Sequence, residues 1–90
     1  MCVARVIVFH YTDRGKLPKL SEEELNEIKK KFYEELKNHP NVWFNGAFVD
    51  EDGRGICEWE APNAEVVEEI VKRVIGEPPA DGTVVVKRVL

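Results

Sequence analysis

The chain has 90 residues, with 13 basic against 17 acidic side chains and a net charge of −4. This length suits a single domain spanning residues 1–90, because a second core would need a longer chain. The basic residues are scattered and form no stripe, so we expect neither nucleic acid nor a membrane surface as a partner. No apolar run approaches the roughly 20 residues that a membrane-spanning helix needs.

The first predicted element is a strand over Cys2–Tyr11, a segment dense in β-branched and aromatic residues. It starts without a charged region or a cleavage site, so we expect no signal peptide. We expect the larger side chains, Ile7 and Phe9, to face the helices. The alternate residues then lie on the open face of the sheet: Val6, Val8 and His10.

A loop over Thr12–Leu20 leads to a helix that begins at a capping box, Ser21-Glu22-Glu23-Glu24. In this motif the serine hydroxyl accepts a hydrogen bond from the N3 amide, and the N3 glutamate reaches back to the serine amide. An apolar stripe follows at helical spacing: Leu25, Ile28, Phe32 and Leu36. Pro40 ends this helix.

Two strands, Val42–Asp50 and Gly55–Glu60, flank a hairpin turn in which Gly53 is expected to be left-handed. With Asp50 opposite Arg54, the register pairs Phe48 with Ile56, Gly46 with Glu58 and Phe44 with Glu60. The alternate residues are Trp43, Ala47, Val49, Cys57 and Trp59, of which we expect Trp43, Val49 and Trp59 to lie under the helices.

A second helix is predicted after Asn63, the expected N-cap, with Gly76 as the C-cap. Its apolar stripe is Val66, Val67, Ile70, Val71 and Val74. Thr83–Leu90 is the last predicted strand. The order β-α-β-β-α-β predicts an α+β, ferredoxin-like sandwich with an antiparallel sheet in the order 4-1-3-2 and both helices on one face.

The open face is predicted to hold His10, Glu58 and Glu60 together at a partly buried position. An imidazole and carboxylates in that arrangement can bind a divalent transition metal, or can act as a general acid/base pair. The alternative is structural: His10 is then a strand-end histidine and the glutamates line a solvated rim.

Other features are less specific. The sequence contains no catalytic motif of high specificity, which favours a binding protein over an enzyme. Cys57 is expected to be a packed thiol, and His39 to lie at a helix C-terminus. Cys2 and Cys57 fall at different heights of the sheet, beyond disulfide reach, so we expect reduced thiols in the cytoplasm. The apolar open face predicts a homodimer, formed through that face or through the edge strand Thr83–Leu90.

Short motifs along nearly the whole chain resemble a family of small ferredoxin-like domains whose members are described as nickel-binding. They are His10, Leu20-Ser21-Glu22-Glu23, Val42–Asp50, Cys57, Glu60-Ala61-Pro62-Asn63-Ala64-Glu65 and Pro79-Ala80-Asp81-Gly82. The resemblance implies dimer formation and nickel binding by histidine and carboxylate groups, His10 first and then Glu60. Glu58 is added by the predicted register. Zinc and copper are alternative metals, and no organic cofactor is expected.

Two other classes share this topology. Dimeric α/β-barrel enzymes, such as small monooxygenases and lactone isomerases, enclose a substrate between sheet and helices, and His10 would then transfer a proton. Ligand-sensing regulatory dimers are the other class. Metal content of the purified protein separates both from the metal-binding hypothesis.

Overall fold

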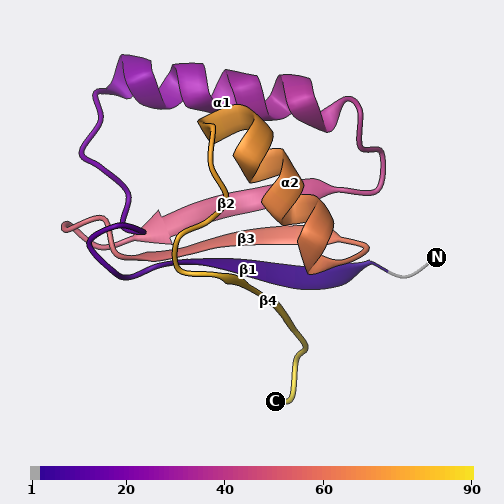
Figure 1. Ribbon diagram of the computed structural model, residues 1–90. Helices are drawn as coiled ribbons and strands as arrows, with labels where there is room; N and C mark the ends of the chain where they lie inside the picture. Colours follow the sequence, from indigo (N-terminus) through magenta and orange to yellow (C-terminus); the bar gives the residue numbers. More distant parts are fainter. Residues whose placement is uncertain (1–2) are drawn as a thin grey trace.

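The computed structural model describes residues 3–90, which form a four-stranded antiparallel sheet with two helices over one face (Figure 1). The elements are β1 (Ala4–His10), α1 (Glu22–Leu36), β2 (Trp43–Val49), β3 (Gly55–Ala61), α2 (Ala64–Ile75) and β4 (Thr83–Val86). The strand order is β2-β3-β1-β4, which is the predicted order read from the opposite edge. The ferredoxin-like fold is therefore confirmed. Neither helix in the described part of the chain is long and apolar enough to cross a membrane.

The strand ends differ from the prediction at both termini. The first strand was expected from Cys2, which lies outside the described residues, and β1 runs from Ala4 to His10. The last strand was expected to reach Leu90, but β4 ends at Val86.

The helix ends form as the sequence predicts. The Ser21 hydroxyl accepts a hydrogen bond from the Glu24 amide at 3.1 Å, and the Glu24 carboxylate accepts one from the Ser21 amide at 3.1 Å. The Asn63 side chain caps α2 by accepting from the amide of Val66 at 2.9 Å. At the other end of α2, Gly76 is left-handed, with φ of 104°. Local sequence alone sets these boundaries, because each cap needs only neighbouring residues.

The core lies between the sheet and α2. Trp59 of β3 is 1% exposed, and its ring centroid lies 4.8 Å from that of Phe44 and 5.6 Å from that of Phe32 on α1. The other members of this core are Val6, Val8, Val42, Ala61, Val67 and Ile70. Helix α1 lies further out, and Leu25 near its start is 51% exposed.

The prediction that Ile7 and Phe9 face the helices is wrong. Val6 pairs with Trp59 across β1 and β3, so both side chains lie on the helix side. Ile7 pairs with Glu58 on the opposite, open face. Trp59 occupies much of the volume beneath the helices, and the short valine side chains of β1 fit beside it.

A β-bulge in β2 exchanges the predicted positions of Trp43 and Phe44. The pairing of Gly46 with Glu58 and of Phe48 with Ile56 agrees with the prediction, but the register shifts between Phe44 and Gly46. Asn45 is the extra residue, so Phe44 pairs with Trp59 rather than Glu60. Phe44 therefore joins the core, whereas Trp43 lies on the open face and is 50% exposed.

Because Phe44 is in the core and Trp43 is not, we expect alanine substitutions at these two neighbouring positions to lower the free energy of unfolding by different amounts. Phe44→Ala should lower the free energy of unfolding by about 2–4 kcal/mol, because it removes ring contacts with Phe32 and Trp59. Trp43→Ala should cost less than about 1 kcal/mol. Urea denaturation of both variants at one low protein concentration measures the difference. A larger loss for Trp43→Ala would contradict the bulged register.

Candidate functional site

His10 lies at the end of β1 with its ring on the helix side of the sheet. Its Nδ1 is 2.8 Å from the carbonyl oxygen of Gly15, and its Nε2 is 2.9 Å from the Sγ of Cys57. A carbonyl oxygen can only accept, so Nδ1 carries the hydrogen and donates it. In the neutral ring Nε2 then has a free lone pair, and it accepts the hydrogen of the Cys57 thiol.

Cys57 comes from β3, where it pairs with Val8 and packs against the core. Burial raises the pKa of the Cys57 thiol to about 12. The thiol is therefore protonated at neutral pH, in agreement with its role as donor to His10. We call these two side chains the His10–Cys57 pair.

The predicted grouping of His10 with Glu58 and Glu60 on one face is wrong. Both glutamates lie on the open face, because residues alternate along β3 and Trp59 between them faces the helices. The structure does bring the two carboxylates together. The side-chain amide of Asn45 donates to both, at 3.2 Å to Glu58 and 3.1 Å to Glu60, and Arg5 lies 3.8 Å from Glu58.

The sequence-based prediction found His10 but missed its partner. Cys57 carried no visible activating neighbour in the sequence, because His10 was assigned to the other face. The signal that could have found the pair is the register itself. Trp59 was correctly expected under the helices, and Cys57 shares its face by alternation. The missing step was the pairing of Val6 with Trp59 and of Val8 with Cys57, which puts His10 on that face as well.

The His10–Cys57 pair offers one nitrogen and one sulfur donor to a metal ion. Imidazole nitrogen and thiolate sulfur both bind divalent transition metals well. The two atoms are 2.9 Å apart, and typical metal–nitrogen and metal–sulfur distances of about 2.0 and 2.3 Å allow both to reach one ion. Within residues 3–90 no group of three or more His, Cys, Asp or Glu side chains is arranged to hold a metal. Further ligands would have to be water or groups of another molecule.

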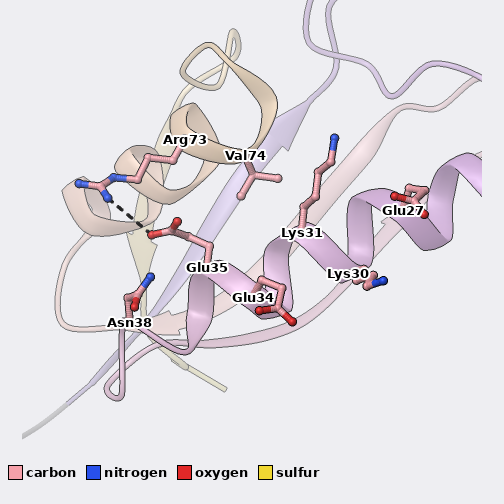
Figure 2. A pocket seen from close by; sticks show the side chains of 8 residues that line it. All are labelled: Glu27, Lys30, Lys31, Glu34, Glu35, Asn38, Arg73 and Val74. Carbon is pink, nitrogen blue, oxygen red and sulfur yellow. Dashed lines mark ion pairs between the residues drawn. The ribbon is translucent and has the colours of Figure 1, made fainter.

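The second histidine, His39, belongs to a different environment. It follows the C-terminus of α1, as predicted, and its Nε2 is 2.9 Å from Glu35. Glu35 also lies 3.8 Å from Arg73 of α2, across a hollow between the two helices (Figure 2). Figure 2 shows that mainly charged side chains line this hollow. The ion pair of Glu35 with Arg73 therefore helps to join the helices, and His39 bonds to the same carboxylate from the end of α1.

The protein is therefore a small α+β, ferredoxin-like protein. Its candidate site is an imidazole and a thiol that lie close enough together to bind one metal ion. Comparison with known protein families matches residues 11–83 to the family described as nickel responsive protein SCO4226-like. The chain belongs to this SCO4226-like family, and the predicted resemblance to a nickel-associated family is confirmed. The matched region contains Cys57 and begins directly after His10. No curated protein and no solved structure matched the chain significantly.

The raised pKa of Cys57 predicts slow alkylation of the folded protein. With a pKa of about 12, roughly one thiol in ten thousand is ionised at pH 8, and only the thiolate reacts. In a Cys2→Ser variant, iodoacetamide labelling followed by mass spectrometry should accelerate at least 100-fold when the chain is unfolded in urea. Equal rates in the folded and unfolded protein would show that Cys57 is neither buried nor bonded as described.

Proposed function

We propose that this protein is a nickel-binding protein in which His10 Nε2 and Cys57 Sγ are the first two ligands. The observation that carries the proposal is the 2.9 Å contact between these atoms, with the lone pair of Nε2 directed toward the sulfur. Binding requires Cys57 to lose its proton, so uptake of the ion should release one proton from this thiol.

Nickel is our first choice of metal because the chain belongs to a family described as nickel responsive. Imidazole and thiolate donors also suit zinc and copper, and copper binds more tightly than nickel to most such sites. Selectivity would therefore depend on metal supply and on the remaining ligands. We place the protein in the cytoplasm, because Cys57 is a free thiol and thiols stay reduced there.

Nickel titration by calorimetry, under a reducing agent that does not bind metals, tests the proposed ligands. His10→Ala and Cys57→Ser should each weaken binding at least tenfold, because each removes one donor atom. His39→Ala is the matched control, since it removes the only other imidazole and should leave the affinity unchanged. Equal affinity of the wild type and His10→Ala, or no binding below millimolar nickel, would contradict the proposal.

The open-face carboxylates are tested in the same titration. Glu58 and Glu60 already have Asn45 and Arg5 as partners, so we expect Glu58→Gln and Glu60→Gln to leave nickel affinity within about twofold of the wild type. If these two variants lose affinity while His10→Ala does not, the carboxylate pair binds the ion and the His10–Cys57 pair does not.

We further propose that the protein is a homodimer in which a second copy covers the open face. This face carries several apolar side chains that the helices do not cover: Ile7, Phe9, Trp43, Phe48, Ile56 and Val84. Phe48 is 59% exposed, which is costly for a phenyl ring in water. Arg5 and the two glutamates place opposite charges on the same face, and a twofold, self-complementary contact can pair such charges between the two copies. The edge strand β4 is an alternative contact.

Light scattering at micromolar concentration tests the dimer. The wild type should have twice the mass of the chain, and Phe48→Asp should shift it toward the monomer, because it places an unpaired charge in a desolvated contact. Tyr33→Asp is the matched control, since Tyr33 is 49% exposed on α1, away from the open face. A monomeric wild type, or an equal effect of both variants, would contradict an interface at the open face.

A further inference from the structure

The carboxylate of Asp81 holds the segment that follows β1. We call residues 11–16 the Thr12 turn. Asp81 accepts hydrogen bonds from the backbone amides of Tyr11 and Thr12 and from the Thr12 hydroxyl. These bonds lower the pKa of Asp81, the hydroxyl bond most, so the group is ionised at neutral pH. An ionised carboxylate with three donors is a strong restraint on a short turn.

The Thr12 turn fixes the position of the Gly15 carbonyl, which faces Nδ1 of His10. The Gly15 amide donates to the Thr12 carbonyl at 3.0 Å, and the Lys16 amide donates to the same oxygen at 2.8 Å. A side chain at Gly15 would overlap the Asp81 carboxylate, so the close approach requires glycine. Directly after the turn, the Leu17 amide donates to the Gly53 carbonyl at 2.8 Å. The turn is therefore held from two sides, by Asp81 and by the β2–β3 hairpin.

The Gly15 carbonyl is the group that decides which nitrogen of His10 carries hydrogen. It accepts from Nδ1 at 2.8 Å, and this leaves Nε2 free to face Cys57. In water, neutral histidine favours the opposite tautomer, with hydrogen on Nε2. A metal ligand needs its lone pair on the atom that points at the ion, and a backbone carbonyl at the other nitrogen is a common way to secure this.

We propose that Asp81 is a positioning residue for His10: by holding the Thr12 turn, it keeps the Gly15 carbonyl at Nδ1 and so keeps the lone pair on Nε2. Asp81 makes no hydrogen bond to either ring nitrogen of His10, which bond to Gly15 and Cys57. Its charge also interacts with the His10 ring, so the control variant has to separate loss of charge from loss of the turn. The effect of Asp81 on the tautomer follows from the hydrogen bonds of the turn and does not need a metal. The effect of Asp81 on nickel affinity rests on the proposed function.

The test combines the tautomer of His10 in the metal-free protein with nickel affinity. Long-range proton–nitrogen NMR of ¹⁵N-labelled protein at pH 8 identifies which ring nitrogen carries hydrogen. In the wild type His10 should have its hydrogen on Nδ1. Asp81→Ala should populate the Nε2–H form, and nickel binding should weaken about 10- to 100-fold. Asp81→Asn keeps one acceptor oxygen and should give an intermediate result.

The matched control is Asp13→Asn, which removes a carboxylate charge from the Thr12 turn itself. Asp13 is an exposed partner of Arg54, with 2.9 Å between the groups, and its side chain does not bond to Gly15 or His10. Asparagine keeps an oxygen that can accept from Arg54, so this variant removes the charge but not the contact. Its His10 tautomer and nickel affinity should match the wild type. If Asp81→Ala does not fold, as judged by its amide spectrum, Asp81→Asn carries the test alone.

The outcomes separate this inference from the proposed function. If the wild type binds no nickel but Asp81→Ala or Asp81→Asn shifts the tautomer, the positioning role stands and the proposed function fails. If nickel binding depends on His10 while neither Asp81 variant changes the tautomer, the positioning role is wrong. An equal shift in Asp13→Asn would also overturn it, since loss of charge would then explain the change.

Discussion

Trp59 is 1% exposed, and its indole fills the space between the sheet and the two helices, against Phe44 and Phe32. Burial of so large a ring determines which face of β3 lies under the helices, because side chains alternate along a strand. Cys57 then lies on the helix side, while Glu58 and Glu60 lie on the open face. The packing of Trp59 thus places the His10–Cys57 pair and the two glutamates on opposite faces of the sheet.

The same constraint separates two kinds of polar chemistry. On the helix side, the members of the His10–Cys57 pair hydrogen-bond to each other and to the Gly15 carbonyl. A charged carboxylate placed there would lose hydration without a partner, which is costly. The glutamates are instead on the open face, where Asn45 donates a hydrogen bond to each of them and Arg5 lies close to Glu58. Soft and hard metal donors are therefore kept on opposite faces of the sheet.

Local sequence rules predicted much of the fold. The capping box at Ser21, the Asn63 cap and the turn at Gly53 each depend on residues a few positions apart, and all three formed as expected. Strand order followed from the order of elements. The faces of β1 and of the start of β2 could not be predicted in this way. They depend on the volume that Trp59 leaves under the helices and on a bulge at Asn45, neither of which has a local sequence signal. Because β1 was assigned the wrong face, His10 was expected on the open face, and its contact with Cys57 was not predicted.

The central claim, that nickel binds to the His10–Cys57 pair, is tested most directly by X-ray absorption at the nickel edge of the loaded wild-type protein. Sulfur and imidazole scatterers have distinct signatures, so the spectrum identifies ligands without any substitution. Our account predicts one sulfur scatterer per nickel and at least one imidazole. A spectrum with only oxygen and nitrogen neighbours would exclude Cys57 as a ligand and contradict the account.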